Sequence, residues 1–67
     1  MQVTVNGAPA EVRESTTVAA LVAAHSGGAD RRVAVALNAA VVPRSRWETT
    51  RLTPGDSIEL LAPTAGG

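Results

Sequence analysis

The chain has 67 residues, no net formal charge and no cysteine. A chain of this length forms one domain and buries only about 60% of the surface that its unfolded form exposes, which leaves little volume for an enclosed active site. Without cysteine, disulfides, thiolate catalysis and cysteine-based metal sites are excluded. Balanced charge, with one Trp and no Phe or Tyr, argues against a nucleic-acid ligand. We therefore expect a protein that is bound by partners and is not an enzyme.

The N-terminal residues lack the charged start and apolar run of a signal peptide, and no apolar run approaches the roughly 20 residues of a membrane span. These features predict a cytoplasmic protein that does not bind membranes.

The first predicted element is a β-hairpin. Asn6-Gly7 favours a two-residue type I′ turn between strands at residues 2–5 and 8–13, because both central positions need a positive φ. Pro9 cannot donate a ladder hydrogen bond, which predicts that the second strand lies at a sheet edge. Side-chain alternation then places one apolar set on a common face: Met1, Val3, Val5, Ala8, Ala10 and Val12.

One short amphipathic helix follows. Ser15, Thr16 and Thr17 are candidate N-caps, and Gly27-Gly28 is a candidate C-cap. Residue 20 is alanine, so the glutamate of a capping box is missing and we expect the helix start to be loosely held. The spacing i, i+3, i+4, i+7 groups four side chains on one face: Val18, Leu21, Val22 and His25.

The second half of the chain predicts strands. Residues 33–37 alternate, with Ala34 and Ala36 facing away from the core. We expect a turn at residues 38–40, a short strand from Val41, and a 3₁₀ segment after Pro43. Trp47 is expected to cover one end of the core, and residues 53–56 to form a turn. In the last strand, residues 57–62, Ile58 and Leu60 point inward while Glu59 and Leu61 point outward. This order predicts an α+β fold with one helix across one sheet face.

These elements resemble the ThiS family, the sulfur carriers of thiamin thiazole synthesis, over essentially the whole chain. The resemblance is carried by several short segments in order: Val5-Asn6-Gly7, Thr17-Val18 with Leu21, Val35-Ala36-Leu37-Asn38, Val42-Pro43-Arg44 with Trp47, Gly55-Asp56, Ile58-Glu59-Leu60 and Gly66-Gly67. It implies a ubiquitin-like β-grasp domain over residues 1–63, with a mixed sheet of four to five strands. It further implies that the first strand pairs in parallel with the last, and that residues 64–67 form a flexible tail.

The resemblance also implies a mechanism. An adenylating E1-like enzyme uses ATP to convert the carboxylate of Gly67 to an acyl-adenylate. A persulfide sulfur donor then displaces AMP, so that Gly67 carries a thiocarboxylate, and a thiazole synthase accepts its sulfur. Gly66 and Ala65 belong to the flexible lead. The carrier itself binds no cofactor or metal.

Alternatives remain open at this point. The ending APTAGG is also close to that of the molybdopterin-synthase small subunit, so the acceptor could instead be molybdopterin or a secondary metabolite. A ubiquitin-like interaction or conjugation module is a third hypothesis, and a terminal Gly-Gly can be an ordinary chain end. Two sets of residues are candidates for partner docking: outward-facing Ala34, Ala36 and Leu61, and the basic Arg44, Arg46 and Arg51.

Overall fold

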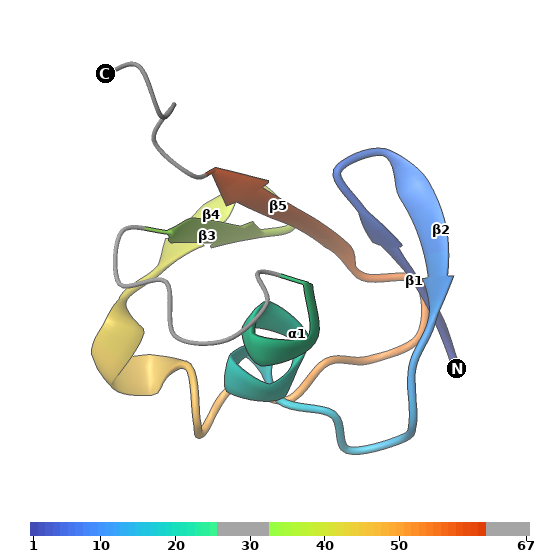
Figure 1. Cartoon of the computed structure of the whole chain (residues 1–67), viewed down its shortest axis with the longest axis horizontal. Helices are drawn as coiled ribbons and strands as arrows, with labels where there is room; N and C mark the ends of the chain where they lie inside the picture. The colour runs from blue at the N-terminus through green and yellow to red at the C-terminus, as the bar shows by residue number, and fades with distance from the viewer. Residues whose placement is uncertain (26–32, 62–67) are drawn as a thin grey trace.

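The computed structural model describes residues 1–25 and 33–61, and within them it shows one mixed sheet with a helix across one face (Figure 1). The five strands lie in the order β2-β1-β5-β3-β4. The elements in chain order are β1 (Gln2–Val5), β2 (Ala8–Glu11), α1 (Val18–His25), β3 (Ala34–Leu37), β4 (Ala40–Val42), the 3₁₀ turn η1 (Arg44–Arg46) and β5 (Ser57–Leu61). This is the predicted α+β order, and β1 pairs in parallel with β5 as the family resemblance implied.

The N-terminal hairpin has the predicted turn and register. Asn6 and Gly7 both have positive φ, 51° and 83°, as a type I′ turn requires. Val5 lies opposite Ala8, as predicted. The strand that contains Pro9, β2, lies at an edge of the sheet, so the missing N–H of proline costs no ladder bond.

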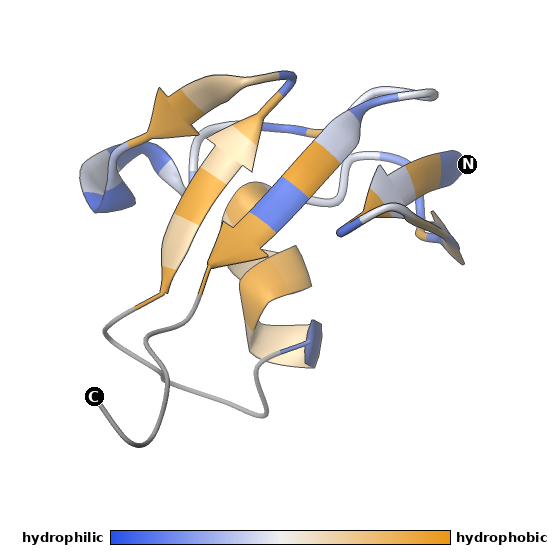
Figure 2. Ribbon diagram, turned by 90° about the horizontal axis from the view of Figure 1, so that it is seen from above, coloured by the Kyte–Doolittle hydropathy of each residue, from blue (hydrophilic) through white to orange (hydrophobic). Residues whose placement is uncertain are grey.

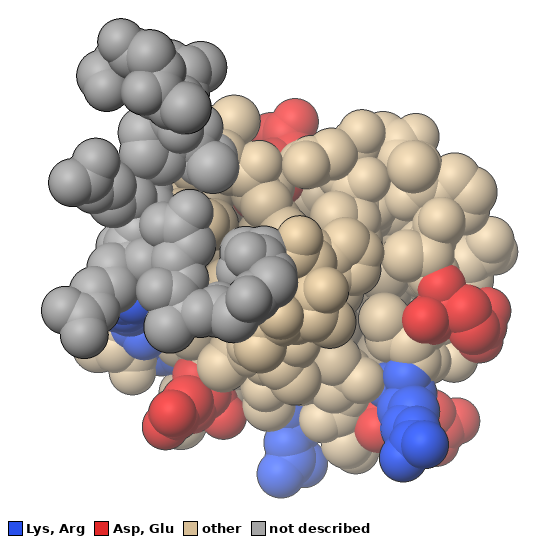
Figure 3. All heavy atoms as spheres, in the orientation of Figure 1, with Lys and Arg blue, Asp and Glu red and all other residues tan. Residues whose placement is uncertain are grey.

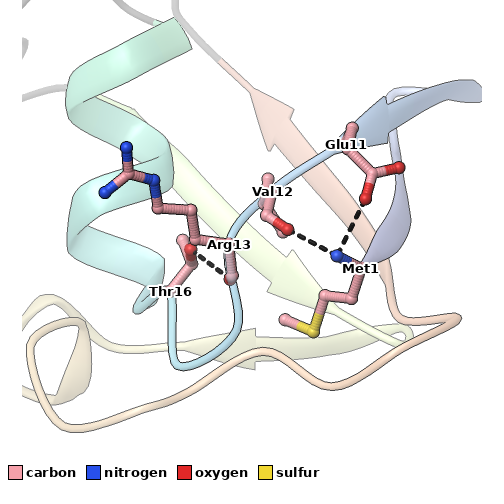
Figure 4. Close-up of polar contacts among 5 residues, drawn as sticks. All are labelled: Met1, Glu11, Val12, Arg13 and Thr16. Carbon is pink, nitrogen blue, oxygen red and sulfur yellow. Dashed lines mark hydrogen bonds and ion pairs between the residues drawn. The ribbon is translucent and has the colours of Figure 1, made fainter.

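The open end of this hairpin is closed by the amino group of Met1 (Figure 4). This group donates to the carbonyl of Val12 at 2.6 Å and lies 2.9 Å from a carboxylate oxygen of Glu11. The amide of Val12 in turn donates to the carbonyl of Met1 at 2.8 Å. Because the Glu11 side chain is 77% exposed, its ion pair contributes little, and the backbone bonds hold this end of the hairpin.

The start of α1 is held more firmly than we expected from the absence of a capping-box glutamate. Thr17 acts as N-cap, and its Oγ1 accepts the amide of Ala20 at 3.1 Å. The carbonyls of the 47–50 segment accept the first two helical amides, Val18 N to Thr50 O at 2.9 Å and Ala19 N to Trp47 O at 3.0 Å. The expectation of a loose start was therefore wrong, because a distant segment replaces the capping box. The candidate C-cap Gly27-Gly28 lies outside the described residues.

The core lies between α1 and the facing side of the sheet. Its buried side chains come from every part of the described chain: Val3, Val5, Val18, Leu21, Val22, Val33, Val35, Trp47, Leu52 and Ile58. His25, predicted on the same helical face, is exposed, and its Nδ1 lies 3.2 Å from the carbonyl of Leu21. Within residues 1–25 and 33–61, no helix combines the length and apolar character needed to cross a membrane.

The second hairpin differs from the prediction at one residue. Ala40 pairs with Leu37, so β4 begins there and the turn consists of Asn38 and Ala39 alone. Both turn residues have positive φ, 50° and 71°, which repeats the geometry at Asn6 and Gly7. The two-residue turn is hard to predict because alanine, here Ala39, is unusual in left-handed backbone and no Asn-Gly pair marks the site.

Asp56 closes the turn that leads into β5. Its carboxylate accepts the amide of Thr53 at 2.8 Å, the hydroxyl of Thr53 at 2.9 Å and the side-chain amide of Asn38 at 3.0 Å. Burial alone raises the pKa of Asp56, but these three hydrogen bonds outweigh it and hold the pKa below its ordinary value. The charged carboxylate therefore joins the 53–56 turn to the β3–β4 turn.

We predict that this carboxylate makes the stability depend on acid. Because the pKa of Asp56 is lower in the folded state, its contribution is complete above the unfolded value of about 3.9 and is lost as the pH falls through the folded value. Urea unfolding of the wild type and of Asp56→Asn, from pH 7 down to pH 2, checks this. The difference between the two should shrink as the pH falls below about 4. A difference that stays constant over this range would contradict the assignment.

Candidate functional site

The residues predicted to carry the chemistry, Gly67 with Gly66 and Ala65, lie outside the described residues. The described chain ends at Leu61, the last residue of β5. The structure therefore defines the base from which residues 62–67 continue, together with the surface beside that base.

This base is a central strand. β5 pairs in parallel with β1 on one side and antiparallel with β3 on the other, and Leu61 lies opposite Ala34. Ile58, the second residue of the strand, has no exposed surface. The strand that precedes the C-terminal residues is thus held by hydrogen bonds on both edges and by the core beneath it.

The sheet face opposite α1 carries the predicted docking residues. The register places Ala34 beside Leu61, and Ala36 beside both Glu59 and Val41. Residues directly opposite each other share a face. We call these five residues the open face. Figure 2 looks onto this side of the sheet, with α1 behind it, and shows hydrophobic residues along β3, β4 and the end of β5.

Two large hydrophobic side chains on the open face are exposed to solvent. Val41 is 78% exposed and Leu61 is 64% exposed, and no other large hydrophobic residue in the described part of the chain is exposed. Ala34 is also exposed, and Ala36 is half-buried. Leu61, Ala34 and Ala36 were predicted to face outward together, and their placement is confirmed.

Val41 was not among the predicted docking residues. Its place on the open face follows from the two-residue turn at Asn38-Ala39, which sets Val41 opposite Ala36. The missed signal was the asparagine itself, which is among the residues that tolerate positive φ and so favours the shorter turn.

The predicted basic residues do not belong to the open face, and their structural surroundings differ. Arg44 and Arg46 lie in η1, which follows β4 through Pro43, and both are exposed. The guanidinium carbon of Arg44 lies 5.3 Å from the centre of the Trp47 ring, within the range of a cation–π contact. Arg51 is exposed, and its backbone forms an isolated antiparallel β-bridge with Thr17 at the start of α1. In the view of Figure 3, charged groups lie mainly towards the edge of the molecule around a broad uncharged area.

Trp47 connects η1 to the sheet. The residue is 7% exposed, and its Nε1 donates to the carbonyl of Val42 at 2.9 Å. The same residue contributes the carbonyl that accepts the amide of Ala19. Trp47 therefore covers the end of the core, as predicted, and also joins β4 to the helix start.

No metal site is evident within residues 1–25 and 33–61, where no three His, Asp or Glu side chains come together. The feature that these residues offer for function is a surface next to the origin of the C-terminal segment.

We predict that Trp47 contributes strongly to stability. Trp47→Phe should lower the free energy of unfolding by about 1–2 kcal/mol, because it removes the hydrogen bond to Val42 and part of the ring. Trp47→Ala should cost about 3–5 kcal/mol. Since Trp47 is the only aromatic residue, unfolding in urea must be followed by circular dichroism. Exposed Ser45→Ala in η1 is the control with little effect, and equal stability of Trp47→Ala and Ser45→Ala would contradict the packing role.

The comparisons with known proteins agree with this architecture. The family model of the ThiS family matches residues 3–67. A crystal structure of the thiamine biosynthesis protein ThiS from Geobacter metallireducens is 36% identical, with both chains covered completely and a TM-score of 0.83. A solution NMR structure of a thiamine biosynthesis protein from the same organism is 37% identical, covers all of this chain and 88% of that one, and has a TM-score of 0.80. No curated protein matches significantly. The described residues contain one α-helix and a five-stranded mixed sheet, and the family match includes Gly66 and Gly67. The chain belongs to the ThiS family.

Proposed function

We propose that this protein is the sulfur carrier for thiazole formation in thiamine biosynthesis, with the sulfur carried on the C-terminal carboxyl group of Gly67. Proteins of the ThiS family are small sulfur carriers and not catalysts. The supporting observation is that the family match runs to Gly67 and therefore includes the Gly-Gly end. Both similar structures are thiamine biosynthesis proteins, which favours this acceptor over molybdopterin.

The proposed chemistry follows from the weakness of a carboxylate as an electrophile. An adenylating enzyme joins the Gly67 carboxylate to the α-phosphate of ATP, and pyrophosphate leaves. Hydrosulfide then attacks the acyl carbon and AMP leaves, which gives a thiocarboxylate and one proton. When the donor is a persulfide, attack gives an acyl disulfide, and a thiol must reduce it to release the same thiocarboxylate. The ATP is bound by the partner, and the carrier needs no cofactor of its own.

Gly66 and Gly67 suit this role because they have no side chains. Their backbone can pass through a narrow channel and adopt angles that other residues avoid. With no cysteine in the chain, the terminal carboxyl group is the natural place for sulfur. The proposed partners are the adenylating enzyme, a persulfide donor and a thiazole synthase, and we propose that all act in the cytoplasm.

Intact mass spectrometry tests this proposal. We expect incubation with the adenylating enzyme, ATP and sulfide to add a mass equal to sulfur minus oxygen. The gain must be localised to the C-terminal fragment, since oxidation of Met1 adds nearly the same mass. The variant that lacks Gly67 should fold and gain nothing. Absence of a gain in the wild type, with a partner shown to be active on another carrier, would overturn the proposal.

We further propose that the open face docks onto the adenylating enzyme. Its exposed hydrophobic side chains, Val41 and Leu61, lie on the same sheet face, and Leu61 is next to the C-terminal segment in sequence. A docked partner would bury this apolar surface while the segment enters its active site.

Charge placed on the open face should therefore weaken docking. We predict that Leu61→Arg raises the KM of the adenylating enzyme for the carrier about tenfold or more, with kcat and carrier stability little changed. The matched control is Ala24→Arg, which adds the same charge at an exposed position of α1, a helix packed on the other sheet face. Steady-state AMP release measures both variants. Equal KM values for the two variants would rule out docking through this face.

A further inference from the structure

The side chain of Asn6 continues the pairing between β1 and β5 after β1 has ended. In this parallel ladder the amide of Thr4 donates to the carbonyl of Asp56, and the amide of Asn6 donates to the carbonyl of Ile58, each at 2.9 Å. The next bond of a regular parallel ladder would run from the amide of Leu60 to the main-chain carbonyl of Asn6. At Asn6, however, φ is 51° and the chain turns towards β2.

The side-chain oxygen of Asn6 takes the place of that carbonyl. Asn6 Oδ1 accepts the amide of Leu60 at 2.8 Å. Without this acceptor the amide of Leu60 would lose its partner on the β1 side, one residue before the end of β5. The same asparagine thus supplies the positive φ of the turn and the last hydrogen bond between β1 and β5.

An equivalent arrangement holds the opposite end of β5. The amide of Asn38 donates to the carbonyl of Ser57 at 2.7 Å, and Asn38 Oδ1 accepts the amide of Ser57 at 3.0 Å. Asn38 also has positive φ, 50°, in the turn of the other hairpin. The two hairpins flanking β5 therefore each contribute a turn asparagine, one to its first residue and one near its last.

We propose that Asn6 is a positioning residue that fixes the end of β5, and with it the point in space after which residues 62–67 follow. The functional part of this inference rests on the proposed sulfur-carrier role. Six residues follow Leu61 and span at most about 20 Å. If Leu60 and Leu61 detach, the linker becomes longer and Leu61 leaves the open face. Both changes lower the effective concentration of the Gly67 carboxylate at the active site of a docked partner.

Three variants separate positioning from stability. Asn6→Gly removes the acceptor and retains a residue suited to the turn, whereas Asn6→Asp restores an oxygen at the same place and still tolerates positive φ. Asn38→Gly is the matched control, because it makes the same exchange in the same turn geometry at the other end of β5. It also loses the bond to Asp56, so its global stability should fall at least as far as that of Asn6→Gly.

The first measurement is amide hydrogen exchange by NMR under native conditions. In Asn6→Gly we expect the amides of Leu60 and Leu61 to exchange about five- to tenfold faster, as loss of one hydrogen bond implies, with a smaller change at Val35. Asn6→Asp should return towards the wild-type rates. Asn38→Gly should instead accelerate Ser57. An unchanged exchange rate at Leu60 in Asn6→Gly would show that the side chain of Asn6 does not hold the end of β5, and would overturn the proposal.

The second measurement is AMP release by the adenylating enzyme as a function of carrier concentration. We expect Asn6→Gly to lower kcat/KM about five- to tenfold, with Asn6→Asp restored and Asn38→Gly close to wild type. An equal loss in Asn38→Gly and Asn6→Gly would show a general effect of stability and overturn the positioning role. If an active partner does not adenylate the wild-type chain, the proposed function is overturned. The hydrogen-exchange result alone would then decide whether Asn6 fixes the end of β5.

Discussion

The structure depends on the insertion of β5 between β1 and β3. Pairing a C-terminal strand with the first strand closes a loop of more than fifty residues, and its entropic cost must be met by hydrogen bonds on both edges of β5 and by burial of Ile58 beneath it. Only two residue pairs define the register with β1. The bonds that extend this short ladder, from Thr4 at one end and through the side chain of Asn6 at the other, therefore have a large share in fixing the strand.

The segment between β4 and β5 has a comparable role on the other side of the core. It contains no strand of the sheet, yet its carbonyls at Trp47 and Thr50 accept the first amides of α1, and the amide of Leu52 donates to the carbonyl of Thr16 at 2.8 Å. Trp47 and Leu52 are both buried. A connection with so many long-range bonds acts as part of the scaffold, which explains how a small core of mostly valine and leucine side chains can hold one short helix in place.

Local patterns in the sequence were sufficient for most of the fold. Asn6-Gly7 fixed the first hairpin, because few dipeptides suit a type I′ turn so well, and the position of Pro9 correctly placed its strand at an edge. The alternation of residues 33–37 and 57–61 predicted which side chains face the core. The parallel pairing of β1 with β5 came from the family resemblance and not from any local pattern, since it joins the two ends of the chain.

Most errors and omissions arose where distant segments meet, and one arose in the local turn between β3 and β4. The capping of α1 by the 47–50 segment has no local signature, so the missing glutamate at position 20 was taken as a weakness. The exposure of Val41 required the register of the second hairpin, in which Ala39 adopts a backbone conformation that alanine rarely takes. The side-chain bonds of Asn6 and Asn38 to β5 were likewise hidden, because a turn preference explains each asparagine without reference to the third strand.

In the proposed function the reactive group lies at Gly67, outside the described residues, and this role places an unusual demand on the fold. In most enzymes the core must hold several catalytic side chains in fixed relation, whereas here the domain must present one surface and one starting point for the segment that follows Leu61. Both are properties of β5 and its neighbours, because Leu61, Ala34 and Ala36 lie together on the open face. Substitutions in the rest of the core should therefore alter function mainly through stability, whereas changes at the end of β5 can alter transfer in a chain that remains folded. The hydrogen bond from Leu60 to Asn6 lies at this boundary, since it extends the pairing of β1 with β5 and lies one residue before the end of the described chain.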